Sequence, residues 1–449
     1  MTYREQLKFL LERDAGFSEA VGLLKQLGQR SGLEVGIFSH HDVDGVSSAL
    51  ILHRMFRRLG AKVVIKFPER FKLLEEDLKL IKGKFDLLVI SDKGTFASYD
   101  DFFEKAENVL IIDHHAPDGN PKKASVFNPA MESHTLAATS LLCHMLATQF
   151  GPTDELDDLT ALLGCRADFA FDPVEERCGE FVRPFIERSM KKFPHLFKTR
   201  LGRPTMYDVV DRRRTALTNQ MAEALHVGTL AHYYGEFLNS GVSGPELVFD
   251  FLKELPADDL IMIKNLDDFL SMAPAGKTIS RILESFQLDW ELLEIRVRSP
   301  IFLGEIKSVG VYLVFAREVP RMQSTPFAAV LPYVASTQLE PLRRAFGHEA
   351  TMIMVFCPKE NGVQISMRGG GGRIDCSLIC AQLVDRLRRL YPGCAGIEGG
   401  VHPDAAECFS GKSVPIYAVM RELLLMIKEW SQQEIRADGG GHFAFRVMG

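Results

Sequence analysis

The sequence is poor in cysteine, with eight Cys among 449 residues and no Cys-x-x-Cys pair. The closest two, Cys376 and Cys380, are one helical turn apart, so we expect them to share a helix face rather than a metal ion. This pattern favours reduced thiols in a cytoplasmic protein over a disulfide framework.

Long apolar runs and a net positive charge are absent as well. No run reaches the roughly eighteen apolar residues of a membrane span, so none is expected. Residues 1–16 are mixed in charge and predict an amphipathic helix rather than a signal peptide. The net charge of -6 excludes a general polyanion binder, so any nucleic-acid contact must come from a local basic patch.

Short apolar runs alternate with helical stretches from residue 33 to about 170, which predicts a parallel α/β sheet. The expected strands are apolar throughout, as strands covered on both faces are. They span 33–39, 62–67, 85–91 and 108–113. The expected helices between them span 46–60, 71–83 and 98–108, and 136–166 predicts two more.

The length predicts two or more domains, and the composition changes along the chain. We expect a first domain over 1–175, a mainly helical insert or connector over 176–300 and a smaller α/β domain over 301–449. The last part combines β-branched runs with glycine-rich segments.

Acidic residues and histidines gather just past three of the expected strands and at the end of one expected helix. Ligands in parallel sheets collect beyond the carboxyl ends of the strands, so these side chains are expected to meet. Carboxylates and imidazoles are ligands for hard divalent cations, and two such ions can clamp a phosphate. The residues are His40, Asp42, Asp44, Asp92, Asp113, His114, His115 and Asp168.

Each group also has a purely structural interpretation. Asp42 or Asp44 would cap the helix over 46–60, and Asp92 would form a turn with Gly94. The triplet at 113–115 would be a solvated loop, and Asp168 a helix-end residue. All four interpretations would have to hold together for the metal site to vanish.

Taken together, these motifs resemble those of the DHH phosphoesterase family. The resemblance rests on HxDxDG at 40–45, SDKG at 91–94, DHH at 113–115 and GCRAD at 164–168, in that order. SMR at 366–368 and EGGVHPDAA at 398–406 resemble the glycine-histidine motif of the domain attached to it. The matched parts are about 30–170 and 300–430, and the resemblance implies an active cleft between two domains.

The resemblance also implies a role for each ligand. His40, Asp42 and Asp92 would hold one metal ion, and Asp44, Asp92, His114 and Asp168 a second, with Asp92 bridging. His115 would contact the scissile phosphate and help to protonate the leaving oxygen. The expected cofactors are two Mn²⁺ ions, or Mg²⁺. His41 is an alternative to His40, and Asp172 to Asp168.

For the substrate, a glycine-rich segment flanked by arginines is expected to form a flexible phosphate-binding loop, with a surface loop that binds nothing as the alternative. Its residues are Arg368, Gly370, Gly371 and Arg373, joined by Gly399, Gly400 and His402. Gly439–His442 invites the same interpretation outside the matched motif. Phe169 and Phe171 either stack a base or pack in the core, and Arg212–Arg214 is a candidate for backbone contacts.

The resulting hypothesis is an Mn²⁺-dependent phosphodiesterase that degrades single-stranded DNA or RNA exonucleolytically to nucleoside monophosphates, similar to the RecJ-like exonucleases. A hydrolase of short substrates is the alternative: nano-RNA, linear or cyclic dinucleotides, or phosphoadenosine phosphate. A scaffold in a replication assembly is a third, which the complete ligand set disfavours. DNA or RNA preference, polarity and a homodimeric state stay open at this point.

Overall fold

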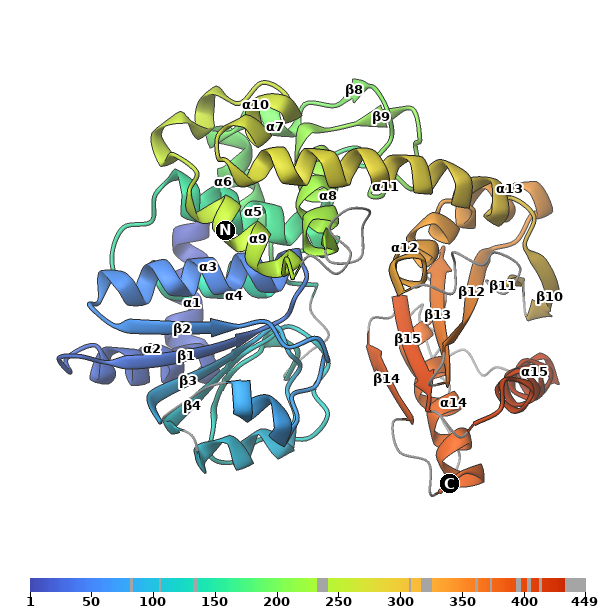
Figure 1. Cartoon of the computed structure of the whole chain (residues 1–449), viewed down its shortest axis with the longest axis horizontal. Coiled ribbons are helices and arrows are strands. Elements are labelled where there is room, and N and C mark those ends of the chain that lie inside the picture. The colour runs from blue at the N-terminus through green and yellow to red at the C-terminus, as the bar shows by residue number, and fades with distance from the viewer. Residues whose placement is uncertain are drawn as a thin grey trace. The chain divides into compact units, whose positions relative to one another are not determined.

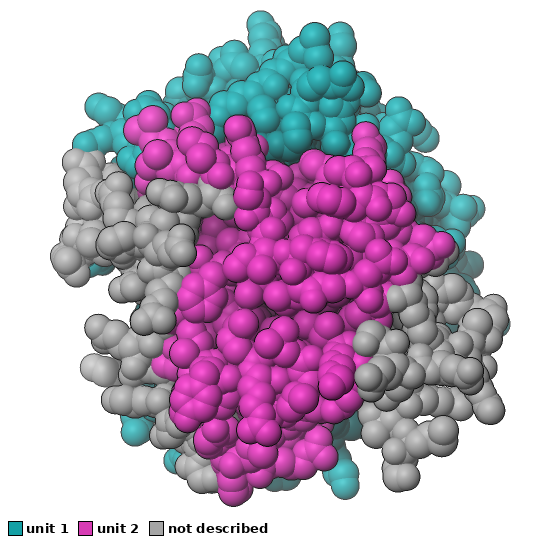
Figure 2. Space-filling model, turned by 90° about the vertical axis from the view of Figure 1, so that its right-hand side faces the viewer, with its two compact units in different colours: residues 1–285 teal, residues 286–449 magenta. Residues whose placement is uncertain are grey.

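The computed structural model falls into two compact units, Met1–Ser285 and Phe286–Gly449 (Figures 1 and 2). The residues that it describes are 1–80, 84–104, 106–131, 136–231, 241–306, 308–315, 325–359, 362–371, 374–392, 397–401, 405–411 and 414–432. The expected three-part division of the chain and the cleft between domains stay predictions.

The first unit is built on a five-stranded sheet in the order β2-β1-β3-β4-β5, and every neighbouring pair is parallel. The sheet confirms the predicted parallel α/β architecture. Its central strands are buried along almost their whole length because helices cover both faces. The strands are β1 (Glu34–Ser39), β2 (Lys62–Lys66), β3 (Phe85–Ser91), β4 (Ala106–Ile112) and β5 (Ser125–Phe127).

Helices α2, α3 and α4 contact this sheet, whereas α1 packs on α2, and α5 packs on α3 and α4. α3 packs on β1 and β2 and also against α4 and α5, whereas α2 packs on β5. α3 begins at an Asp42 N-cap, and its apolar residues fill the space between sheet and neighbouring helices. The bounds are α1 (Tyr3–Arg13), α2 (Ala15–Leu27), α3 (Val43–Arg58), α4 (Thr139–Ala147) and α5 (Glu155–Ala167).

Two predicted helices of the sheet domain are wrong. The segments expected over 71–83 and 98–108 form only 3-10 helices, Glu75–Leu80 and Ala97–Glu104. The first buries only Leu78 and the second only Tyr99 and Phe102, too little apolar surface to hold a regular amphipathic helix. Residues 81–83 and 105 lie outside the described residues.

The rest of the first unit is mainly helical in its described parts, as expected, and carries two short hairpins. α8 packs against α5 and α9, which joins this region to the sheet domain. The helices are α6 (Arg183–Lys192), α7 (Pro194–Phe197), α8 (Leu217–Thr229), α9 (Gly244–Lys253), α10 (Leu266–Ser271) and α11 (Ala275–Val297), and two further 3-10 helices are Pro129–Met131 and Ala257–Met262. The hairpins pair β6 (Phe171–Asp172) with β7 (Arg177–Cys178), and β8 (Arg200–Leu201) with β9 (Arg214–Thr215). The boundary between the units falls within α11.

The second unit contains a mixed six-stranded sheet in the order β10-β11-β12-β13-β15-β14, in which only β11 and β12 pair in parallel. α14 and α15 share a buried apolar core with the sheet. The strands are β10 (Ile301–Ile306), β11 (Val309–Phe315), β12 (Ala350–Lys359), β13 (Gly362–Gly370), β14 (Ile397–Val401) and β15 (Ala405–Ser410). The helices are α12 (Thr325–Ser336), α13 (Leu339–Phe346), α14 (Cys376–Leu390) and α15 (Ile416–Gln432).

The described residues include helices and cysteines that bear on the expectations about membrane spans and disulfides. None of the described helices combines the length and the apolar character needed to cross a membrane. The cysteines in the described part of the chain are free thiols, and Cys376 and Cys380 are both buried on α14.

Candidate metal centre

The candidate site begins with three residues that directly follow neighbouring strands. His40 follows β1, Asp92 follows β3 and Asp113 follows β4. The ends of these strands are in register, because Ser39 pairs with Ser91 and Ser91 with Ile112. The parallel sheet therefore carries the first residue after each strand to the same edge.

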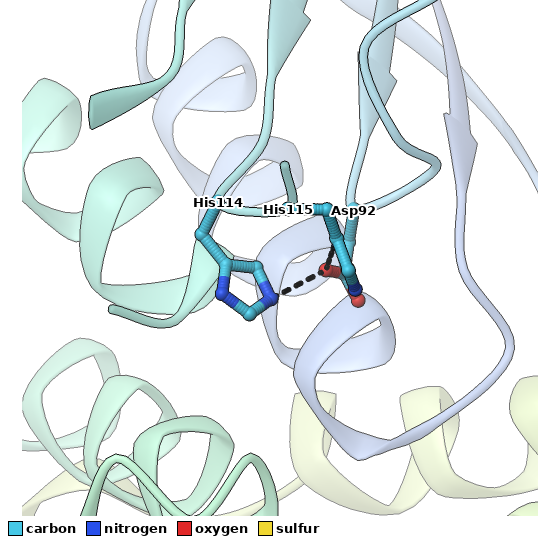
Figure 3. A group of neighbouring side chains, drawn as sticks. All are labelled: Asp92, His114 and His115. Carbon is cyan, nitrogen blue, oxygen red and sulfur yellow. Dashed lines mark ion pairs between the residues drawn. The ribbon is translucent and has the colours of Figure 1, made fainter. Parts of the chain in front are cut away.

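The side chains at this edge form two adjoining groups. In the first group, His40 Nδ1 lies 2.9 Å from Asp42 Oδ2 and 3.7 Å from Asp92 Oδ2. In the second group, His114 Nε2 lies 3.0 Å from Asp168 Oδ2 and 3.5 Å from Asp92 Oδ1. Asp92 therefore turns one carboxylate oxygen toward each group, and Figure 3 shows its side chain facing His114 and His115.

Asp44 completes the second group from α3. One ligand atom from each of Asp44, His114 and Asp168 lies within 4.8 Å of the other two. The group of His40, Asp42 and Asp92 meets the same condition, and so does the group of Asp92, His114 and His115. The structure thus brings together every residue expected to ligate metal.

The capping interpretation of the first motif is also correct, and it is compatible with a ligand role. Asp42 Oδ1 accepts the amide of Gly45 at 2.9 Å as the N-cap of α3, which leaves Oδ2 facing His40. Asp44 accepts the amides of Thr139 and Ser140 at 2.6 and 3.0 Å, at the start of α4. These bonds fix both carboxylates before any cation binds.

Asp92 adopts an unusual backbone conformation. Its φ of +58° is in the left-handed region, which is costly for a residue with a side chain. Its amide donates to Ile112 O at 3.0 Å, and its carboxylate accepts Thr139 Oγ1 at 2.9 Å. The strain places a 1% exposed carboxylate between the two groups instead of continuing the strand.

His115 belongs to a hydrogen-bonded network with Asp113, Thr95 and Asn128. Its Nδ1 lies 2.8 Å from Asp113 Oδ1, while Asp113 Oδ2 accepts Thr95 Oγ1 at 2.9 Å and Asn128 Nδ2 at 3.3 Å. Asn128 also donates to His115 O at 2.9 Å. The network fixes the orientation of the His115 imidazole.

Thr139, Ser140, Thr95 and Asn128 were not expected from the sequence. Asn128 directly follows β5, so the rule that located His40 and Asp92 would have located it had the three-residue strand been recognised. Thr139 and Ser140 give no such signal, because their contacts with Asp92 and Asp44 depend on how α4 packs.

The electrostatics of the site show an excess of buried negative charge. Burial, together with repulsion from Asp44 and Asp42, raises the pKa of Asp92 well above its ordinary value. Burial raises the pKa of Asp168 to about 8, against the attraction of His114. Burial acts to lower the pKa of His114, but Asp168 and Asp92 outweigh it and raise that pKa. Carboxylates crowded in this way need cations to stay ionised together.

The residues present fit divalent cations. Within the described part of the chain, Asp168 Oδ2 is buried, and its 3.0 Å contact with His114 Nε2 lacks hydrogen-bond geometry. A buried oxygen without a hydrogen-bond donor fits a cation ligand. A donor set of carboxylates with a few imidazoles suits Mn²⁺ and also Mg²⁺.

The two alternative ligands lie apart from these groups. His41 is not part of any of the three groups, although its ring lies 4.4 Å from that of His40. Asp172 Oδ1 caps the amide of Val174 at 2.8 Å, and its Oδ2 lies 3.7 Å from Arg166 Nη2. The geometry therefore favours His40 and Asp168 as the ligands.

The first half of the expected phosphate-binding loop of the second unit, residues 368–370, is part of a strand, which corrects that part of the prediction. Arg368, Gly369 and Gly370 belong to β13 and pair with Ile353, Met352 and Thr351 of β12. The strand continues through the glycines because the ladder to β12 satisfies their backbone groups. Arg368 stacks on the Tyr333 ring at 5.4 Å.

The other expected substrate residues are only partly described. Gly371 follows β13 with a φ of +96°, and Gly399 and Gly400 belong to β14, paired with Cys408 and Glu407. Arg373, His402 and Gly439–His442 lie outside the described residues.

Residues 34–165 match the model for the DHH family, N-terminal domain. The match contains the first three motifs and ends three residues before Asp168. The chain therefore contains an N-terminal domain of the DHH family, which confirms the resemblance seen in the motifs.

Similar proteins extend the comparison. The chain is 29% identical to the single-stranded-DNA-specific exonuclease RecJ of Bacillus subtilis over an alignment of 164 residues, and the match covers 33% of this chain and 20% of the relative. It resembles the structure of RecJ in complex with Mn²⁺ from Thermus thermophilus, with a TM-score of 0.58 and 18% identity over 92% of this chain and 55% of that one. It also resembles the DHH domain of a member of the s1p family of ribosomal proteins, with a TM-score of 0.60 and 13% identity over 94% and 92%.

These likenesses establish the fold over most of the chain. The chain spans about a fifth of the length of its exonuclease relative by sequence, and about half of the Thermus structure. The activity, the substrate and the partners are consequently matters of proposal.

Proposed function

We propose that the protein is a phosphodiesterase that hydrolyses single-stranded nucleic acid from an end and releases nucleoside monophosphates, with two Mn²⁺ or Mg²⁺ ions as cofactors. The observation that carries this proposal is the position of Asp92, whose two oxygens face two separate groups of ligands. A bridging carboxylate between adjacent ions is the arrangement that a two-metal phosphoesterase needs.

His40, Asp42 and Asp92 would hold one ion, and Asp44, Asp92, His114 and Asp168 the other. When bound, such ions polarise phosphoryl oxygens and lower the pKa of an attacking water. Asp42 and Asp44 keep their orientation through the caps of α3 and α4, so little reorganisation is required when a substrate arrives.

His115 would contact the scissile phosphate and deliver a proton to the leaving oxygen. Its Nδ1 lies 2.8 Å from Asp113 Oδ1, which supports Nε2 as the atom that would carry this proton. Asp113 would stabilise the protonated ring and fix its tautomer, as a carboxylate paired with a catalytic imidazole does.

For the substrate, the printed name of the Bacillus relative supports single-stranded nucleic acid. The second unit would bind substrate through Arg368, Gly370, Gly371, Gly399 and Gly400, together with Arg373 and His402. Short substrates are the second candidate: nano-RNA, linear or cyclic dinucleotides, or phosphoadenosine phosphate. The assembled ligand set disfavours the scaffold alternative. A cytoplasmic location and a homodimer stay predictions.

The test is hydrolysis with Mn²⁺ of a panel of substrates by wild-type protein and by Asp92→Asn. The panel contains 5′-labelled single-stranded DNA, the same sequence as RNA, a dinucleotide, cyclic dinucleotides and pyrophosphate. Asp86→Asn is the matched control, because Asp86 lies at the opposite end of the same strand, β3.

Release of mononucleotides from long strands by wild type and Asp86→Asn, abolished in Asp92→Asn, is the expected result. Turnover of short substrates alone would establish the second candidate. Absence of all turnover in protein that binds Mn²⁺ would overturn the enzymatic proposal.

A further inference from the structure

Phe169 directly follows the candidate ligand Asp168 and is held in a strained conformation. Its φ is +56°, in the left-handed region that residues with side chains avoid. The side chain is 42% exposed, whereas Phe171, two residues later, is 2% exposed and packs in the core. Of the two aromatic residues weighed from the sequence, only Phe169 therefore presents its ring to solvent.

The Phe169 ring rests on a rigid polar support. Its centroid lies 5.1 Å from that of Tyr207 and 5.4 Å from the Arg166 guanidinium. Arg166 is fully buried and donates to Asn219 Oδ1 at 2.5 Å, Phe171 O at 2.9 Å and Tyr207 O at 3.2 Å. This support holds an exposed aromatic ring in place without burying it.

Tyr207 belongs to a basic segment, residues 198–215, which contains β8, β9 and the connection between them (Figure 1). Arg203 and Arg214 are exposed there. Arg214 Nη2 donates to the neutral Thr199 hydroxyl, and the Arg214 charge also attracts the Asp211 carboxylate. The basic residues of this segment are Lys198, Arg200, Arg203, Arg212, Arg213 and Arg214, against the acidic residues Asp208 and Asp211. A chain with a net charge of -6 needs such a local patch to attract a polyanion.

We propose that Phe169 stacks on a nucleobase of single-stranded nucleic acid whose scissile phosphate lies at the metal centre, and that Arg203 and Arg214 bind phosphates farther along the strand. This inference rests on the proposed function and adds a strand-binding surface within the first unit. Phe169 is the neighbour of Asp168 in the sequence, and a nucleobase is joined to its phosphate through a single sugar.

Physical principles favour this assignment over simple packing. Single-stranded nucleic acid is bound by aromatic rings that stack on bases and by cationic side chains that follow the phosphates. A left-handed phenylalanine in a turn would be replaced at lower energy by glycine or asparagine if the turn alone were required. We therefore assign the strained backbone at Phe169 to holding its ring exposed to solvent, where a base can stack on it.

The first experiment separates the ring from the turn. Asn tolerates a left-handed backbone, so Phe169→Asn removes the ring and keeps the turn, while Phe169→Trp keeps an aromatic face. KM and kcat are measured with single-stranded DNA and with the same strand carrying abasic residues at the end that is hydrolysed.

We expect Phe169→Asn to raise KM about tenfold for the normal strand and to leave KM for the abasic strand unchanged. Phe169→Trp should retain the wild-type KM, and all three proteins should unfold at similar temperatures. Equal KM values of wild type and Phe169→Asn on the normal strand would overturn the inference. So would an equal rise on both strands, because that identifies a structural role.

The second experiment measures binding of a fluorescent oligothymidylate in EDTA, so that it does not depend on hydrolysis. Removing two phosphate contacts in Arg203→Gln/Arg214→Gln should weaken binding and lower the slope of log Kd against log[NaCl] by about 1.4. Arg4→Gln/Lys8→Gln on α1, which carries none of the candidate ligands, is the matched control.

An unchanged salt slope in the hairpin variant, or an equal change in the control, would overturn the assignment of the arginines. Failure of the proposed function gives a different result: wild-type protein would hydrolyse neither strand, whatever the binding data show. The two failures are therefore distinguishable.

Discussion

Thr139 Oγ1 donates a hydrogen bond of 2.9 Å to Asp92 Oδ1, and both side chains are buried. This bond joins the first residue of α4 to the carboxylate between the two ligand groups. The same residue donates its amide to Asp44, so one helix start orients ligands from two distant parts of the chain. Such contacts behind the ligands tune metal affinity.

We therefore predict that Thr139→Val weakens Mn²⁺ binding roughly 10- to 100-fold, because the valine removes the hydroxyl that donates to Asp92 Oδ1. Thr139→Ser keeps the hydroxyl and should bind Mn²⁺ nearly as wild type does. Calorimetric titration of both variants with Mn²⁺ measures the effect. Wild-type affinity in Thr139→Val would show that the bond has no role in the metal centre.

Asp113 allows the proton role of His115 to be separated from metal binding. Asp113→Asn keeps the shape of the side chain but removes the charge next to His115 Nδ1. We expect kcat to fall about 100-fold or more while KM and the bound Mn²⁺ stay close to wild type. Kinetics and metal analysis of the same preparation provide the measurement; loss of metal together with activity would identify Asp113 as part of the ligand scaffold.

The residues that follow the strands were predictable because the order and direction of the strands determine which edge of the sheet they reach. Once four apolar strands are recognised as parallel, the residues that follow them must reach one edge, and His40, Asp92 and Asp113 do so. Thr139 was not predictable, since 47 residues separate it from Asp92 in the sequence and only the packing of α4 brings them together.

The structures of two other segments could not be predicted from the sequence: the glycines of β13 and the segment at 71–83. Gly369 and Gly370 have the composition of a loop, but pairing with β12 extends the strand through them. The segment at 71–83 has helical periodicity, yet it buries too little apolar surface to form more than a 3-10 helix. In both places tertiary contacts decide between local alternatives that sequence leaves nearly equal.

Gly164 marks a close approach of α5 to the ligands. A Cβ at this position would lie 2.2 Å from Ser140 Oγ and 2.7 Å from Asp44 Oδ1. Gly164→Ala should therefore destabilise the fold by about 1–3 kcal/mol and weaken Mn²⁺ binding, since Asp44 has to move.

Gly22→Ala is the control for this change, because nothing lies within 4 Å of a Cβ in the middle of α2. It should stabilise the protein by about 0.5–1 kcal/mol through helix propensity. Urea unfolding of the metal-free proteins measures the change in free energy of unfolding, and its sign, for both substitutions. Equal effects of the two substitutions would contradict a steric conflict at Gly164.

Asp158 on α5 is a buried carboxylate that stabilises the fold apart from the ligands. Its oxygens lie 2.9 Å from His144 Nε2, 2.9 Å from Arg188 Nη2 and 2.7 Å from Lys192 Nζ. Burial acts to raise the pKa of Asp158, but the bonds to His144, Lys192 and Arg188 outweigh it and lower the pKa to about 2. In the unfolded state the pKa of this aspartate is about 3.9. The folded state therefore favours the ionised carboxylate more than the unfolded state does.

This difference sets a pH window for stability. A lowered folded pKa contributes stability that is complete above about pH 5 and is lost as the pH falls from about 4 to 2. Asp158→Asn should cost about 2–3 kcal/mol at pH 7, and the difference from wild type should shrink on acidification. Glu12→Gln breaks an exposed pair with Lys8 and should change little at any pH. Urea unfolding of the three proteins at pH 7, 5, 4 and 3 measures these differences. If the difference in free energy of unfolding between wild type and Asp158→Asn stays constant down to pH 3, the charge of Asp158 is not the source of its stabilising effect.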